Sequence, residues 1–137
     1  MEKSLLRLLI PEKQWPRYNE PPRLEGDWAV ASDPHIPHYS PLWTARLIDK
    51  AKEHNVRNLI FGGDFLNLDV ASTYPTITEI PTVGEEKRAS RTLIAKLKPY
   101  FDRILVLPGN HDLRFLRRVQ SVLKEPMTWA DFAEDFL

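Results

Sequence analysis

Short apolar runs alternate along the chain with longer segments in which apolar residues recur at helical spacing. The runs lie at Trp28–Ser32, Arg57–Phe61 and Arg103–Leu107, and their length and flanking turn residues predict three β-strands. The first of them, Trp28–Ser32, is expected to be buried on both faces, as in a parallel sheet. The aromatic residues expected in the core are Trp28, Trp43 and Phe61.

The segments between and after these strands predict helices. Ser40 followed by Pro41 has the form of an N-cap and a first helical residue, and Thr128–Asp131 resembles a capping box. Glu85 and Glu86 suit the positive end of a helix dipole. The helices are expected from Pro41 to His54, from Glu85 to Tyr100, from Leu113 to Lys124 and onward from Thr128. The order β-α-β-α-β-α predicts an α/β fold with parallel strands and right-handed crossovers.

Two segments follow neither pattern. Residues 1–26 contain four prolines after the apolar residues Leu5–Ile10, which predicts a Pro-rich leader that runs extended over the domain at 27–137. The alternative is an arm that docks on a partner. The connection from Asp64 to Val83 is long for a compact domain, and such connections usually bind substrate or act as lids.

The composition limits the kinds of site and partner. The chain has 137 residues, enough for one domain with a genuine core, and 19 basic residues balance 19 acidic ones. This balance removes the electrostatic argument for a nucleic-acid partner, but leaves nucleotides and nucleic acids among the substrates to consider. The lack of cysteine excludes disulfides, thiolate–metal sites and a thiol nucleophile. No apolar run approaches the roughly 18 residues of a membrane span, so we expect no membrane contact and a cytoplasmic location.

Polar side chains of the kind that bind metal ions follow each predicted strand. Asp33 and His35 follow the first strand, Asp64 follows the second, and Asn110 and His111 follow the third. The carboxyl ends of parallel strands lie at one edge of a sheet, so we expect these residues to meet there. Asp33 with His35 can bind one cation, Asp64 can bridge two, and an amide such as Asn110 offers a neutral oxygen. His111 can donate a proton to a leaving group, which predicts a two-metal site for phosphate chemistry.

Two alternatives involve no such chemistry. Turns favour Asp, Asn and Gly for backbone reasons alone, so each cluster by itself has a purely structural explanation. A nucleotide-binding α/β module would carry a glycine-rich phosphate loop after the first strand, and the sequence has none there. The coincidence of three polar clusters with three strand ends favours the metal site over both.

Three motifs resemble those of a known family. Asp33–His35 (Asp-Pro-His), Gly63–Asp64 and Gly109–Asp112 (Gly-Asn-His-Asp) resemble the first three motifs of the calcineurin-like metallophosphoesterases in order and approximate spacing. The resemblance extends over Trp28–Leu116. It implies the N-terminal βαβαβ part of a two-sheet α/β sandwich, and a hydrolase that cleaves phosphomonoesters or phosphodiesters with two divalent metal ions. Manganese, iron and zinc all suit nitrogen and oxygen ligands.

The resemblance also implies a role for each residue of the motifs. Asp33 and His35 would bind the first metal ion. Asp64 would bridge the two ions, and Asn110 would bind the second. His111 would be the catalytic acid or the group that stabilises the transition state.

The sequence departs from one branch of the family after its second motif. Protein Ser/Thr phosphatases continue with Asp-Arg-Gly, whereas this chain has Asn67–Asp69 (Asn-Leu-Asp). Asn67 thus stands in place of the carboxylate that orients the catalytic histidine, although its carbonyl still accepts a hydrogen bond. Arg114 is a candidate contact for the substrate phosphate. The chain lacks the arginine of the Asp-Arg-Gly motif, which argues against a phosphoprotein phosphatase. The stretch Gly63–Asp69 is closer to bacterial and phage-type phosphoesterases.

The placement of the histidines sets a further expectation. Family members supply another histidine and a Gly-His-x-His motif from later strands, and no histidine follows His111 in this chain. His38 and His54 are expected at the surface. The domain therefore resembles the N-terminal half of a phosphoesterase, incomplete at its C-terminus, with an unpaired strand edge and exposed apolar surface. The alternative to a two-metal enzyme is a non-catalytic half-domain that binds metal weakly or pairs with another chain.

Overall fold

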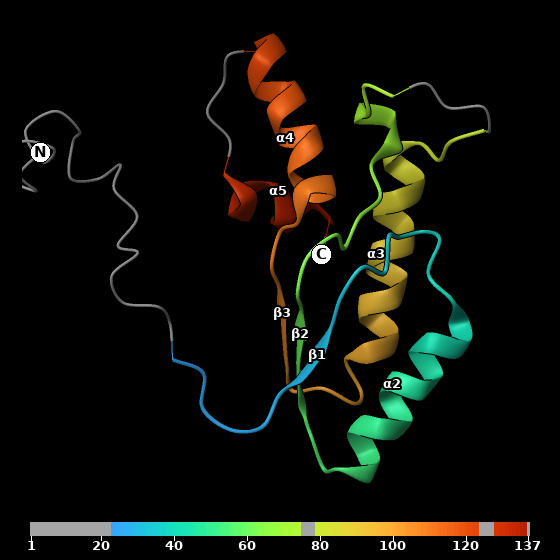
Figure 1. Cartoon of the computed structure of the whole chain (residues 1–137), viewed down its shortest axis with the longest axis vertical. Coiled ribbons are helices and arrows are strands. Elements are labelled where there is room, and N and C mark those ends of the chain that lie inside the picture. The colour runs from blue at the N-terminus through green and yellow to red at the C-terminus, as the bar shows by residue number, and fades with distance from the viewer. Residues whose placement is uncertain (1–22, 75–78, 124–127, 137) are drawn as a thin grey trace, which may run out of the picture.

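A three-stranded parallel sheet forms the centre of the structure, which is a computed structural model. The structure describes residues 23–74, 79–123 and 128–136. The strands are β1 (Ala29–Ala31), β2 (Asn58–Phe61) and β3 (Arg103–Val106), in the order β1-β2-β3. A helix lies between each pair of consecutive strands (Figure 1). The α/β fold class predicted from the sequence is confirmed.

Helices flank this sheet within the described residues. α2 and α3 lie on the same side of the sheet, whereas α4 and α5 follow the carboxyl end of β3 (Figure 1). A short 3-10 helix, η2, lies in the connection after β2. The bounds are α2 (Pro41–Glu53), η2 (Asp69–Ala71), α3 (Val83–Leu97), α4 (Asn110–Leu123) and α5 (Trp129–Phe136).

The start signals of two helices act as the sequence predicted. Ser40 is the N-cap of α2, and its side-chain oxygen accepts a hydrogen bond from the Trp43 backbone at 3.4 Å. At α5, the Thr128 backbone donates to Asp131 Oδ2 at 2.9 Å, and the Asp131 backbone donates to Thr128 Oγ1 at 3.2 Å. These reciprocal bonds satisfy backbone donors that a helix end leaves without partners.

The other two helices begin earlier than predicted. α3 starts at Val83 because Thr82 and Glu85 form a capping box that the sequence interpretation missed. α4 starts at Asn110, three residues before the predicted Leu113. The polar residues after β3 are therefore the first turn of a helix, which gives their side chains a fixed position relative to the sheet.

The hydrophobic core lies between the sheet and the helices on its covered face. Leu59 and Phe61 of β2 are fully buried, as are Leu93 and Leu97 of α3, and Ala51 of α2 joins the same cluster. Burying one such large side chain contributes roughly 1.5–3 kcal/mol. The core thus fixes β2 at the centre of the sheet and, with it, the chain that leaves its carboxyl end.

The opposite face of the sheet is exposed. Val30, Ile60 and Leu105 lie in register across the three strands, and Val30 is 70% exposed and Leu105 37% exposed. The prediction that the first strand is buried on both faces is therefore wrong, since side chains alternate between the faces of β1 and one face is exposed. Exposed apolar side chains, which the sequence led us to expect, are thus present on this face.

One aromatic residue expected in the core lies outside it. Trp28 is half-buried before β1, and the guanidinium of Arg103 lies 4.7 Å from the centre of its ring, a cation–π contact. Trp43 packs against the core and Phe61 is fully buried, as predicted. Trp28 therefore packs against Arg103 at the edge of the sheet and not against the core.

The structure describes only part of the two segments that were expected to lie outside the regular elements. Residues 1–22 of the predicted leader lie outside the described residues. The long connection from Asp64 to Val83 is present and contains η2, while residues 75–78 within it also lie outside the described ranges. Among the helices described, none combines the length and the apolar character needed to cross a bilayer.

Candidate metal centre

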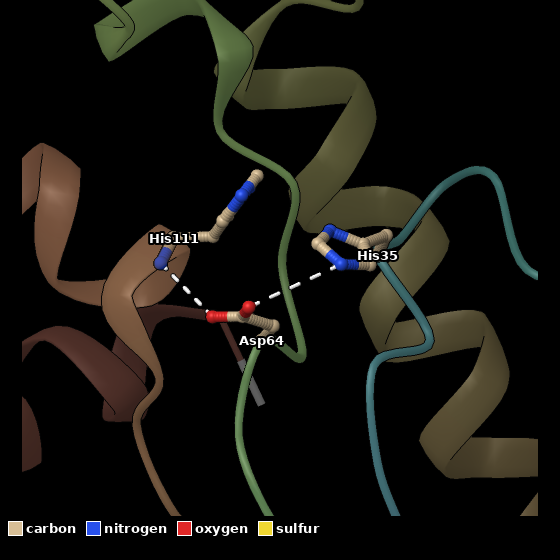
Figure 2. Close-up of side chains that lie close together, drawn as sticks. All are labelled: His35, Asp64 and His111. Atoms are coloured by element: carbon tan, nitrogen blue, oxygen red, sulfur yellow. Dashed lines mark hydrogen bonds and ion pairs between the residues drawn. The ribbon is translucent and has the colours of Figure 1, made fainter.

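The strand ends bring predicted metal ligands together at the carboxyl edge of the sheet. His35 Nε2 lies 3.8 Å from Asp33 Oδ1 and 4.0 Å from Asp64 Oδ2. Figure 2 shows His35 and His111 on either side of Asp64. Two donor atoms that each lie about 2.0–2.2 Å from one ion are at most roughly 4.4 Å apart. The imidazole therefore lies close enough to either carboxylate to share a divalent cation with it.

Asn110 lies against the same aspartate from the first turn of α4. With its amide nitrogen facing the carboxylate, that nitrogen is 3.1 Å from Asp64 Oδ2 and 3.2 Å from Oδ1. A half-turn of the amide brings its oxygen to the same place. A carboxylate beside an amide oxygen is a donor pair of the kind that oxygen-seeking divalent ions bind.

His111 contacts Asp64 with its backbone and turns its ring toward Asn67. The His111 backbone N–H donates to Asp64 Oδ1 at 3.0 Å, and ring Nδ1 lies 3.0 Å from the backbone oxygen of Asn67. A carbonyl oxygen accepts hydrogen bonds and never donates, so Nδ1 carries the proton of this bond and Nε2 is left for an ion or a substrate. His35, Asp64 and His111 offer ligand atoms within 4.8 Å of one another, which makes them a candidate metal-binding cluster.

Asn67 orients both histidines, through two different groups. Its side-chain Oδ1 lies 3.2 Å from His35 Nδ1, and its Nδ2 donates to Asp69 Oδ2 at 2.7 Å. Because Nδ2 is the donor to Asp69, Oδ1 is the acceptor from His35 Nδ1, and His35 Nε2 is the ring nitrogen that faces the carboxylates. Histidines that bind metals usually have such an outer hydrogen bond. The side-chain carbonyl of Asn67 therefore serves His35, and its backbone carbonyl serves His111.

Arg114 extends this network. Its Nη1 lies 3.3 Å from Asp69 Oδ1, with the arginine side chain 20% exposed and the aspartate side chain 32% exposed. Arg114 is one helical turn beyond Asn110, so both residues lie on the same side of α4. Asp69 therefore connects Arg114, the candidate phosphate contact, to Asn67, because its carboxylate bonds to both side chains.

The carboxylate of Asp112 holds two segments of the site together. It is fully buried and accepts hydrogen bonds from the backbones of Phe65 at 3.1 Å, Leu66 at 2.7 Å and Gly109 at 2.7 Å. Burial raises the pKa of the Asp112 carboxyl, and the three backbone donors oppose that rise. Asp112 therefore links the chain after β2 to the turn before α4, where the candidate ligands lie.

Backbone conformation at the site is restricted at two glycines. A Cβ atom on Gly109 would come within 2.1 Å of Asp64 Oδ1 and 2.3 Å of the Asp64 backbone nitrogen. Gly63 has φ +128° and lies beside Gly109, so it combines a glycine conformation with a close approach. Position 109 accepts no larger residue unless the Asp64 backbone moves.

Several larger residues at the site also have left-handed backbone conformations. Non-glycine residues in this region cost about 1–3 kcal/mol each, and they concentrate at functional sites. Leu68 is the least expected of these residues, since residues with bulky apolar side chains rarely adopt the left-handed backbone conformation. The residues and their φ angles are Asp33 (56°), His35 (46°), Asp64 (48°) and Leu68 (49°).

Glu86 is a buried part of the site that the sequence interpretation missed. We assigned it to the helix dipole, but it is fully buried, and both of its oxygens accept from the Leu68 backbone N–H, at 2.9 and 3.0 Å. Burial raises the pKa of its carboxyl to about 7. A signal was present, because Glu86 precedes Ser90, Leu93 and Leu97 on the buried face at helical spacing.

Four further polar residues do not belong to this candidate cluster. His38 and His54 are exposed, as predicted. Arg117 and Arg118 are exposed on α4. None of these four residues contributes to the metal-binding cluster found among the described residues.

Replacing Asp112 by asparagine is expected to destabilise the fold. The amide nitrogen of Asp112→Asn would face backbone donors, and each buried donor left without an acceptor costs about 1–3 kcal/mol. Urea unfolding at neutral pH measures the loss. The control is Asp102→Asn, which removes the carboxylate of an exposed ion pair with Arg57 and should cost much less. Equal losses in the two variants would contradict the role given to Asp112.

The buried Glu86 carboxyl predicts a pH dependence of stability. Its pKa rises from 4.5 in the unfolded chain to about 7 in the native state, so the native state holds a proton that the unfolded chain has released. This contribution is fully present below pH 4.5 and is lost as the pH rises through 7, a change of about 3 kcal/mol.

Comparison with Glu86→Gln isolates this effect, because the glutamine does not titrate. The free energy of unfolding of Glu86→Gln, minus that of the wild type, should increase from pH 4.5 to pH 7 and then level off. Urea unfolding at intervals of one pH unit measures the difference. A difference that stays constant across this range would show that Glu86 titrates as an ordinary exposed glutamate.

Comparison with known proteins identifies the family. A family model described as calcineurin-like phosphoesterase matches residues 28–137. No curated protein and no solved structure has a significant match to the chain. The family match includes the strands β1, β2 and β3 and every candidate site residue described above. The chain belongs to the calcineurin-like phosphoesterase family.

Proposed function

We propose that this protein hydrolyses phosphomonoesters or phosphodiesters with two divalent metal ions. The observation that supports this most directly is the approach of His35 to Asp33 and Asp64, at 3.8 and 4.0 Å, from the ends of β1 and β2. Asn110 adds a further donor beside Asp64. Family membership makes a hydrolase the expected class of enzyme.

The donor set fits the metal ions expected for this chemistry. Asp33 and His35 would hold the first ion, Asp64 would be shared, and Asn110 would hold the second. Carboxylate, imidazole and amide donors suit manganese, iron or zinc. By the pattern of the family, the first ion takes one more protein ligand and the second takes two. Bound ions would stabilise charge on the phosphoryl oxygens and make an attacking water more acidic.

His111 is proposed as the general acid. The hydrogen bond between its Nδ1 and the Asn67 carbonyl is present whether the ring is neutral or protonated, because Nδ1 carries a proton in both forms. The protonated ring can therefore give its Nε2 proton to the oxygen of the leaving group and return to the form that Asn67 stabilises. This arrangement holds the ring orientation constant through the transfer.

Arg114 is proposed to bind the phosphate group of the substrate. A guanidinium has five N–H donors and pairs with phosphate in a bidentate geometry. Its contact with Asp69 holds the side chain near Asn67. Phosphate esters of small molecules, nucleotides and nucleic acids all present this anion, and the site residues described here favour none of them over the others.

A second candidate function is that of a half-domain that pairs with another chain. The exposed apolar face at Val30 and Leu105 favours it, because such a surface is usually covered by a partner. In this case the chain would bind one ion or none on its own. The number of ions bound distinguishes the two candidates.

Metal titration tests the two-metal proposal. With Mn²⁺ in isothermal titration calorimetry, the wild type should bind two ions per chain. Asp64→Asn should lower the affinity for both ions, because Asp64 is the shared ligand, whereas Asp49→Asn on the exposed face of α2 should change neither. Binding of one ion or none by the wild type would favour the half-domain.

Replacement of His111 tests its role as an acid. His111→Ala should lower kcat for p-nitrophenyl phosphate and its diester by about 10²–10⁴-fold while KM and Mn²⁺ binding change little. His54→Ala, at the exposed end of α2, is the matched control and should behave as the wild type. If His111→Ala instead loses an ion, His111 is a metal ligand within the cluster with His35 and Asp64.

A further inference from the structure

One peptide group connects a buried carboxylate to the candidate acid. The carbonyl of the peptide between Asn67 and Leu68 lies 3.0 Å from His111 Nδ1. The N–H of the same peptide donates to Glu86, at 2.9 and 3.0 Å from its two oxygens. Because the C=O and N–H of a trans peptide point in opposite directions, Glu86 on one side fixes the direction of the carbonyl on the other.

The orientation of this peptide needs such support. Leu68 is fully buried and has φ 49°, a left-handed conformation that is unfavourable for a leucine. Rotation of the Asn67–Leu68 peptide would move Leu68 out of this conformation, and it would turn the Leu68 N–H toward His111 in place of the Asn67 carbonyl. The Glu86 oxygens oppose that rotation, since it would leave the buried Leu68 N–H without its acceptor.

The hydrogen bond from Leu68 N–H to Glu86 also affects how strongly the Asn67 carbonyl accepts from His111. A donor that is bound to a carboxylate makes the carbonyl of its own peptide a better acceptor. Asn67 itself has no charge at the place where related phosphatases have a carboxylate. Glu86 stands one peptide group farther from His111, on α3.

We propose that Glu86 is a positioning residue that holds His111 in its Nδ1–H form through the Asn67–Leu68 peptide. Glu86 thereby takes the place of the carboxylate that position 67 lacks. The catalytic consequence rests on the proposed function of His111, whereas the effect on the ring does not. The hydrogen bonds of Glu86 come from the Leu68 backbone, so its effect passes through the backbone.

Two substitutions of similar size separate this role from simple packing. Glu86→Gln keeps an oxygen that accepts from the Leu68 N–H, whereas Glu86→Met fills the same space without a comparable acceptor. Long-range ¹H–¹⁵N correlation spectra distinguish protonated from unprotonated ring nitrogens of a neutral histidine. The wild type and Glu86→Gln should show His111 as the Nδ1–H form, and Glu86→Met should show a mixture with the Nε2–H form.

Kinetics with Mn²⁺ and p-nitrophenyl phosphate give the second readout. Glu86→Met should lower kcat by about 10-fold or more with little change in KM, and Glu86→Gln should restore most of it. The same spectra and assays on Glu85→Gln, which alters only the exposed capping box of the same helix, provide the control.

Two results would overturn the proposal. One is a wild-type His111 in the Nε2–H form, which is decisive even if Glu86→Met does not fold. The other is an unchanged His111 form in a folded Glu86→Met. If the wild type hydrolyses neither ester while the spectra behave as expected, the proposed function fails and the positioning by Glu86 stands.

Discussion

The buried carboxylate of Asp112 is the interaction on which the geometry of the site depends. Three backbone N–H groups converge on it, two from the chain after β2 and one from Gly109 before α4. A buried charge is tolerable when it is satisfied in this way and very costly when it is not. Asn110 and His111 lie in the same helical turn as Asp112, so the bonds that fix Asp112 also fix their distance from Asp64.

The same interaction helps to maintain an unfavourable backbone. Asp33, His35, Asp64 and Leu68 all have left-handed conformations, each at a cost of about 1–3 kcal/mol. Hydrogen bonds to charged groups contribute about 1.5–3 kcal/mol each, which is comparable. Two buried carboxylates, Asp112 and Glu86, each accept from backbone groups that follow Asp64. The strained residues Asp64 and Leu68 therefore lie in the segment that these acceptors hold, after the carboxyl end of β2.

The sequence predicted those parts of the site that depend on position along the chain. Polar residues after an apolar strand must lie at the carboxyl edge of a parallel sheet, so the meeting of Asp33, His35 and Asp64 followed from the order of elements. Contacts between side chains and distant backbone were not predictable in this way. Glu86 bonds to Leu68, and His111 to the Asn67 carbonyl, because of peptide orientations that no residue type specifies. The two-sided burial expected for β1 was wrong because an apolar run does not show which face will be covered.

The neutral side chain at position 67 has a further consequence for the charge of the site. Asp33 and Asp64 already place two carboxylates beside His35, and Asp69 lies beyond Asn67. A carboxylate at 67 would add another negative charge in direct contact with His35. An amide oxygen orients the ring without this effect and leaves Nε2 as a donor for a metal ion. For His111, by contrast, the proposed role as an acid calls for an orienting group, and Glu86 lies on the far side of a peptide group from the ring. The chain thus separates two requirements that one aspartate at position 67 would have combined.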